Sequence, residues 1–336
     1  SIKTKLGMNT PFSARFASSW SLLACAAIAC ASLLSGKTAQ GGNATENIGG
    51  TQAIHLAMQL TLADGDELLI PDPGYTTFTM SARMLNAHPV PYSLTPERGF
   101  MPSIEELETL VSPRTRMIIV NSPSNPLGAV FSREVLEELL AFARRHDLWI
   151  LSDEVYEHMV YDGALHQSAA RFPGLAARAF IVSSFGKTYH VTGWKVGYVA
   201  APAVLTTEFR KVHQFNVFTV NTPMQHALAH FMGDAAPYLE LPAFYAHKRD
   251  LFAAGLAKTR FKLLPSAGTY FQCVDIGEVS DLGEADFCQW LTSEIGVAAI
   301  PLSAFYGDGF DQRVVRFCFA KKDETLRTAL DRLAKL

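Results

Sequence analysis

The chain has 336 residues, of which 49% are hydrophobic and 18% charged, and its 29 Lys and Arg nearly balance 32 Asp and Glu, giving a net charge of −3. This length predicts roughly two globular domains, and the composition excludes a disordered chain. The balance of charge argues against binding nucleic acid or acidic membranes through bulk charge. None of the five cysteines forms a C-x-x-C pair, so we expect reduced thiols, no zinc site and a cytoplasmic protein.

Residues 1–47 differ in composition from the rest and are predicted to be an atypical N-terminal segment. Residues 19–36 are almost uncharged, rich in Ala, Leu, Ser and Cys, and follow Lys3, Lys5 and Arg15. This pattern allows three interpretations: a secretory signal, an ordinary buried helix, or a stretch foreign to the fold. The run is too short and too rich in serine for a convincing membrane span.

From residue 48 onward, short apolar runs alternate with helical patterns. Residues 134–146 carry an apolar stripe that predicts a helix with Ser132 as its N-cap, and Ser103 with Glu106 gives a capping-box signature. The alternation predicts an α/β domain with a mostly parallel sheet. The expected strands, each buried on both faces, are residues 67–70, 117–120, 148–151, 180–182 and 196–199.

Polar residues follow four of these runs, where the carboxyl ends of parallel strands place ligand sites. The segments are Pro-Asp-Pro-Gly-Tyr ending at Tyr75, Asn-Ser-Pro-Ser-Asn ending at Asn125, Ser-Asp-Glu-Val-Tyr ending at Tyr156, and Ser-Ser-Phe-Gly-Lys ending at Lys187. A turn or a helix cap would explain Asn125 or Ser184 taken alone. Because four strand ends carry such groups together, a binding site at this edge is favoured.

Several common sites are excluded by missing residues. The Gly-Lys-Thr at residues 186–188 resembles the end of a phosphate-binding loop, but that motif needs glycine where Ile181 stands. No G-x-G-x-x-G follows a strand, and no G-x-S-x-G is present. His226 and His230 lie four residues apart without the intervening Glu of a metalloprotease helix, so no metal is expected.

A lysine, an acid, a phenol and an amide at one sheet edge suit pyridoxal phosphate. The Lys187 amine would hold the cofactor as an imine, and Asp153 would keep the ring nitrogen protonated. Tyr156 and Asn125 could donate hydrogen bonds to the ring oxygen, and Tyr75 offers a flat face for stacking.

The sequence resembles the class I/II pyridoxal-phosphate aminotransferases of fold type I. SSFGKTYHVTGWKVGY at residues 183–198 is similar to the family signature S-x-x-K-x(7)-[KR]-x-G-Y, and N-x-P-x-N-P-x-G at 121–128 and S-D-E-V-Y at 152–156 support it. Within this family the sequence, including residues 211–225, is most similar to the methionine and kynurenine/glutamine aminotransferase branch. The resemblance covers residues 48–336 and implies a large cofactor-binding domain at 48–232 and a smaller α+β domain at 233–336, with a strand at 269–274.

The resemblance also implies roles for single residues. Lys187 would be the Schiff-base lysine and would move the substrate proton, with Asp153 and Tyr156 completing the catalytic set. Arg316 and Asn125 would bind the substrate carboxylate, and Gly268 would let a substrate approach. The cofactor-binding residues would be Gly50, Thr51, Tyr75, Asn125, Asp153, Tyr156, Ser184, Lys187 and Lys195, the last standing where many relatives carry arginine.

The implied activity is transfer of the amino group of methionine or an aromatic or other large apolar amino acid to a 2-oxo acid, by a homodimer. Two alternatives stay open: a β-lyase acting on cysteine conjugates, and an inactive truncated paralogue. Relatives carry a longer head with a Gly-Phe-Pro motif before the Gly-Gly-Thr turn. Here the residues before Gly49 lack that motif and lack an apolar strand, so we expect a truncated or out-of-frame N-terminus.

Overall fold

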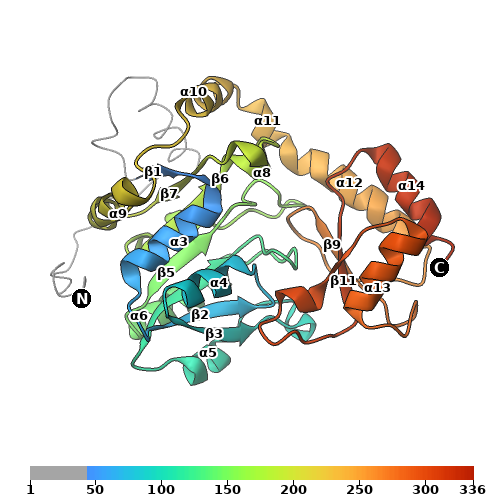
Figure 1. The fold of residues 1–336 in the computed structure, drawn as a ribbon, viewed down its shortest axis with the longest axis horizontal. Helices are drawn as coiled ribbons and strands as arrows, with labels where there is room; N and C mark the ends of the chain where they lie inside the picture. The colour runs from blue at the N-terminus through green and yellow to red at the C-terminus, as the bar shows by residue number, and fades with distance from the viewer. Residues whose placement is uncertain (1–43) are drawn as a thin grey trace.

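The structure, a computed structural model, describes residues 44–336, which build two β-sheets (Figure 1). The seven-stranded sheet has the order β1-β7-β6-β5-β4-β2-β3, and the four-stranded sheet has the order β10-β11-β9-β8. The strands of the large sheet are β1 Ala44–Asn47, β2 Glu67–Asp72, β3 His88–Ser93, β4 Thr115–Asn121, β5 Trp149–Asp153, β6 Ala179–Ser184 and β7 Gly197–Ala200. Those of the small sheet are β8 Lys262–Leu263, β9 Phe271–Asp275, β10 Ile300–Pro301 and β11 Val314–Cys318.

The large sheet confirms the predicted fold class. β3, β2, β4, β5 and β6 are parallel neighbours, whereas β7 runs antiparallel to β6 and β1 runs antiparallel to β7. Each of the five predicted strands forms within two residues of its expected bounds. The central strands β4, β5 and β6 are buried on both faces, as their continuous apolar sequences indicate.

Helices cover both faces of the large sheet. One face packs against α3 Gly49–Thr61, α4 Thr77–Met84 and α9 Ala203–Asn216, and the other against α5 Ile104–Leu110, α6 Arg133–Arg145 and α7 Pro173–Ala176. The remaining helices are α8 Phe185–Thr188, α10 Thr222–Phe231, α11 Ala236–Leu239, α12 Leu241–Leu256, α13 Glu284–Trp290 and α14 Asp323–Leu333. Short helical turns lie at Pro96–Arg98, Ala169–Arg171, Thr192–Trp194, Leu291–Ile295 and Leu302–Phe305.

The two predicted helix caps have different outcomes. Ser132 caps α6, since its hydroxyl accepts a hydrogen bond from Val135 N. Ser103 caps α5 by accepting from Glu106 N. The second hydrogen bond of a capping box, from Ser103 N to the Glu106 carboxylate, was predicted wrongly. The Glu106 carboxylate accepts instead from Ser93 N at 2.9 Å, because the neighbouring strand β3 offers it a competing backbone donor.

The sequence before Gly49 lacks an apolar strand, as expected, yet a polar strand forms there. β1 lies at the edge of the large sheet and pairs with β7, although its sequence Ala-Thr-Glu-Asn is mostly polar. Arg210 of α9 donates to Ala44 O at 2.7 Å and to Thr45 Oγ1 at 3.1 Å. Hydrogen bonds to β7 and Arg210 therefore hold β1 at the sheet edge, although its sequence is too polar to be held there by hydrophobic burial. The predictions for residues 19–36 lie outside the described residues.

The C-terminal part is joined to the large sheet by α10, α11 and α12, which run toward the small sheet (Figure 1). α12, α13 and α14 pack on the small sheet around a core that includes Phe252, Phe287 and Phe317. The predicted strand at 269–274 begins only at Phe271, because Thr269 has a φ of 65°. The division at residues 232 and 233 stays a prediction. Within residues 44–336, no helix has the length and apolarity that crossing a membrane requires.

Candidate active site

The carboxyl ends of three neighbouring strands bring the predicted site residues together. β4 ends at Asn121, which is in register with Asp153 at the end of β5, and β6 ends beside them at Ser184. Asn121 Nδ2 donates to Asp153 O at 3.2 Å, and Asn121 Oδ1 accepts from Asn125 N at 2.9 Å. Asn121 thus fixes the backbone of two site residues, a role that its position at a strand end indicated only weakly.

Asp153 carries a carboxyl group buried at this edge, with 4% of the residue exposed. Burial raises the pKa of Asp153 to about 7, although a hydrogen bond from Val155 N to Oδ1 opposes the rise. The nearby Glu154 charge raises the pKa further. The Asp153 carboxylate is therefore poorly stabilised by the residues around it, and a cation beside it would be strongly favoured.

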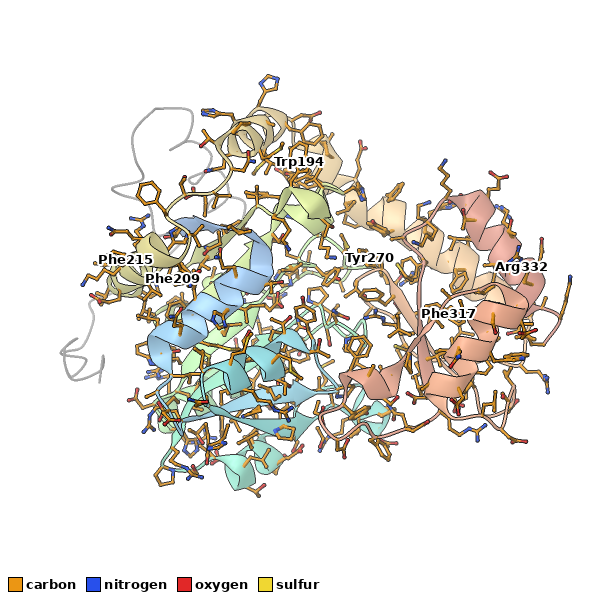
Figure 2. All side chains as sticks on the ribbon, viewed as in Figure 1. Trp194, Phe209, Phe215, Tyr270, Phe317 and Arg332 are labelled. Carbon is orange, nitrogen blue, oxygen red and sulfur yellow. The ribbon has the colours of Figure 1, made fainter. Side chains whose placement is uncertain are left out.

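Lys187 lies on the first turn after β6. Ser184 caps α8 by accepting from Gly186 N at 3.3 Å, so its hydroxyl takes the helix-cap role that its sequence position allowed. Lys187 Nζ lies 5.7 Å from the centre of the Tyr270 ring, and the Tyr270 hydroxyl is 3.5 Å from that of Tyr156. Sequence reasoning missed Tyr270, which lies between the two parts of the molecule (Figure 2).

Tyr156 is buried near Asp153 and contacts Tyr270. Burial raises the pKa of Tyr156 well above its ordinary value, and the Asp153 charge is among the contributing causes. The Tyr156 ring packs edge-on against Tyr270, with 5.3 Å between ring centres. Lys187 and Tyr156 thus both lie beside Tyr270, and the shared role predicted for Lys187, Tyr156 and Asp153 stays a prediction.

The N-terminus of α3 forms a second part of the site. Ile48 provides no side-chain cap, and the first turn has no acidic residue, so backbone N–H groups there are available to an anion. A Cβ at Gly49 would lie 3.8 Å from Lys195 Nζ, and one at Gly50 would lie 3.9 Å from Ser184 Cβ. This corner of the molecule therefore combines helix amides, a hydroxyl and an ammonium group. Next to it, Thr51 Oγ1 lies 3.4 Å from the Tyr75 hydroxyl.

Arg316 extends from β11 of the small sheet to the edge of the large sheet. Its Nη1 donates to Asn125 Oδ1 at 2.5 Å. Its guanidinium carbon lies 3.9 Å from the centre of the Phe271 ring and 4.6 Å from that of Phe305. Within the described residues its buried Nε has no hydrogen-bond partner. Arg316 is thus held in place while part of its hydrogen-bonding capacity stays free.

Gly268 differs from its expected role. A Cβ there would lie 2.8 Å from Val130 Cγ2, 2.9 Å from Met159 O and 2.9 Å from Pro123 Cβ. The protein's own chain occupies this space, so the prediction that glycine leaves room for a substrate is wrong. Close packing of the hairpin ahead of β9 against the large sheet requires the glycine instead.

Comparisons with known proteins identify the family. The family model for aminotransferase class I and II matches residues 29–333. The chain belongs to this family. The family match begins at residue 29, whereas the motifs placed the start of the resemblance at residue 48. Members of class I and II use pyridoxal phosphate, so this chain is an aminotransferase of the pyridoxal-phosphate type.

Several individual relatives are similar to this aminotransferase over most of its length. It is 43% identical to methionine aminotransferase of Escherichia coli over 293 residues, covering 87% of this chain and 76% of the relative. Kynurenine–oxoglutarate transaminase 1 of Homo sapiens is 33% identical, with 87% and 77% covered. A crystal structure from Escherichia coli, of a protein identified with a methionine aminotransferase function, superposes with a TM-score of 0.87 at 41% identity, covering 93% of this chain and 84% of that one.

Proposed function

We propose that this aminotransferase moves the amino group of methionine, or of an aromatic or other large apolar amino acid, to a 2-oxo acid. The observation that carries the proposal is Arg316, a half-buried cation with free hydrogen-bonding capacity beside the rings of Phe271 and Phe305. A carboxylate on this arginine would have apolar surface next to it. Similarity to methionine and kynurenine aminotransferases supports the same substrate class.

The residues at the sheet edge fit pyridoxal phosphate in charge and in kind. Bound there, the cofactor supplies a carbonyl that accepts an amino group and a ring that withdraws electrons from the substrate. The N-terminus of α3, from Gly50 and Thr51, would hold the phosphate together with Ser184 and Lys195. As an ammonium group, Lys195 supplies a point charge where a guanidinium would supply a bidentate contact.

Asp153 would hold the ring nitrogen. Its carboxyl group has a pKa of about 7 because burial disfavours its charge, and a protonated ring nitrogen alongside would return that pKa toward its ordinary value. Each charge thereby stabilises the other. Tyr156 and Asn125 would donate to the ring oxygen, and Tyr75 would stack on the ring.

Lys187 would provide the amine that holds the cofactor and afterwards moves a proton at its Nζ. Its place on a short helix that begins directly after β6 fixes the backbone of the amine relative to Asp153, which ends the neighbouring strand β5. The Tyr270 ring lies beside Nζ, with 5.7 Å between Nζ and the ring centre, and this contact helps to orient the amine at the sheet edge.

Purified protein supplied with pyridoxal phosphate, methionine and a 2-oxo acid tests the proposal. We expect the oxo acid of methionine to accumulate together with the amino acid formed from the acceptor. A Lys187→Ala variant should form neither. Equal product formation by both proteins would overturn the assignment of Lys187. Product from aspartate but not from methionine or phenylalanine would overturn the substrate class.

We also propose that the protein acts as a homodimer. Large apolar side chains are exposed on the described surface, including Phe215 at 87% and Phe218 at 78%, and Phe215 projects from α9 (Figure 2). Burying such side chains against a second copy removes apolar surface from water. Sedimentation of the purified protein tests this, since a mass near 36.8 kDa at all concentrations would contradict it.

A further inference from the structure

We propose that Phe305 is a positioning residue for Arg316, and that residues 302–307, here called the 302–307 turn, tie this arginine to the loop that carries Tyr75. The inference rests on the proposed role of Arg316 in binding the substrate carboxylate. It adds a physical connection between the substrate-binding and cofactor-binding parts of the site, which lie on different sheets.

The first step is the way Arg316 is held. One hydrogen bond, from Nη1 to Asn125 Oδ1, fixes a single end of the guanidinium group. Its Nε makes no hydrogen bond within the described chain, so the other constraints come from the rings of Phe271 and Phe305. Guanidinium is weakly hydrated and stacks readily on aromatic rings, so these contacts orient it without occupying its N–H groups. The free N–H groups can then bind a carboxylate.

The second step is the way Phe305 is held. Its carbonyl accepts from Gly74 N at 3.0 Å, and two residues later Gly307 N donates to Asp72 Oδ1 at 2.9 Å. A Cβ at Gly74 would lie 2.3 Å from Pro71 O, so the segment between Asp72 and Tyr75 has a tightly defined backbone. The 302–307 turn is therefore attached at two points to the end of β2.

The third step connects the attachment to the cofactor side. Tyr75 directly follows Gly74, and its hydroxyl contacts Thr51 on the first turn of α3. On the opposite side, Glu284 of α13 accepts from Ser303 N at 2.5 Å. The 302–307 turn is thus held from the large sheet and from the small sheet. Its ring at position 305 defines where Arg316 lies relative to Tyr75.

The test compares Phe305→Leu with Phe305→Tyr in the cofactor-loaded protein. Leucine keeps an apolar side chain but loses the flat face, whereas tyrosine keeps that face. Phe310→Leu is the matched control, since Phe310 lies on the same loop, is 55% exposed and contacts Tyr306. Binding is measured by calorimetry with two probes: methylthiobutanoate, which is methionine without its amino group, and methylthiobutanol, which also lacks the carboxylate.

We expect Phe305→Leu to weaken binding of methylthiobutanoate by about 3- to 10-fold and to leave methylthiobutanol unchanged. The KM for methionine should rise by a similar factor with little change in kcat, and Phe305→Tyr and Phe310→Leu should behave as the unaltered protein. Equal binding of methylthiobutanoate by Phe305→Leu, or equal losses for both probes, would overturn the proposal.

Asp72 supplies an independent test should Phe305→Leu fold poorly. Asp72→Ala removes the acceptor of Gly307 N, and Asp72→Asn restores an acceptor of the same size. We expect Asp72→Ala to weaken methylthiobutanoate binding by about 2- to 5-fold and Asp72→Asn to reverse most of that loss. Identical binding of methylthiobutanoate by both variants would contradict the proposed connection between the 302–307 turn and the end of β2. Failure of the proposed function is distinguishable, because it would appear as absent turnover of methionine in the unaltered protein.

Discussion

Replacing Asp153 by asparagine removes a carboxyl group whose pKa is raised by burial from 3.8 to about 7. In the cofactor-free protein, the folded state keeps a proton on Asp153 between these values, whereas the unfolded state has lost it. The unfolded state therefore binds fewer protons, and the free energy of unfolding falls as the pH rises through this interval. Three pH units correspond to about 4 kcal/mol, an upper limit because the folded protein can relax. The asparagine side chain has no proton to lose, so the Asp153→Asn variant lacks this decline.

Denaturant unfolding of both cofactor-free proteins at about pH 5 and about pH 8 measures the difference. Relative to the unaltered protein, the free energy of unfolding of the asparagine variant should rise by up to about 3 kcal/mol between the two conditions, because only about two pH units, from 5 to 7, lie within the interval. Added pyridoxal phosphate should stabilise the unaltered protein more than the variant, because only the carboxylate attracts a protonated ring nitrogen. Parallel profiles without cofactor would refute the role of burial. Equal stabilisation by the cofactor would refute the charge pairing.

Three further substitutions have predicted effects. Glu284→Ala should lower the free energy of unfolding in denaturant by about 3 to 6 kcal/mol, because the buried carboxylate accepts from Ser303, Gln312 and Val314 N. Gly74→Ala should lower the melting temperature, at a cost of about 1 to 3 kcal/mol, since its Cβ would collide with Pro71 O. Arg316→Lys should raise the KM for methionine about 10-fold or more in steady-state assays, because an ammonium group cannot bind a carboxylate bidentately.

Matched variants serve as controls for these three. Glu284→Gln keeps the size and one oxygen acceptor, so it should lose less stability than alanine, and equal losses would contradict the hydrogen-bonding argument. A Cβ at Gly193 meets no atom within 4 Å, so Gly193→Ala should melt near the unaltered protein. A KM for Arg316→Lys equal to that of the unaltered protein would remove the arginine from substrate binding.

The sequence is sufficient to predict the large sheet because its strands carry their own signal. Residues 117–120 and 148–151 are continuous apolar runs, and burial on both faces of a parallel sheet requires that pattern. Since parallel strands share a carboxyl edge, the positions of Asn125 and Asp153 followed from the same reasoning. The roles given to these residues remain proposals until they are tested chemically.

Other features have no local signal. β1 is polar and depends on Arg210, which is far away in the sequence, for its hydrogen bonds. Tyr270 and Phe305 resemble ordinary core aromatics in the sequence, and only the packing of the small sheet against the large one brings them to Lys187 and Arg316. The Glu106 carboxylate accepts a hydrogen bond from Ser93 N of β3 rather than from the start of its own helix, because tertiary contacts compete with local capping. These contacts depend on the fold rather than on the spacing of residues.

The central claim is that the amine of Lys187 holds pyridoxal phosphate, and reductive trapping tests it most directly. The cofactor-loaded protein is treated with borohydride, which reduces an imine between a lysine amine and the cofactor's aldehyde carbon to a stable secondary amine. The peptides of the treated protein are then analysed by mass spectrometry. We predict that the phosphopyridoxyl group appears on Lys187 and that Lys195 stays unmodified. Labelling of another lysine, or no labelling of a protein that binds the cofactor, would contradict the claim.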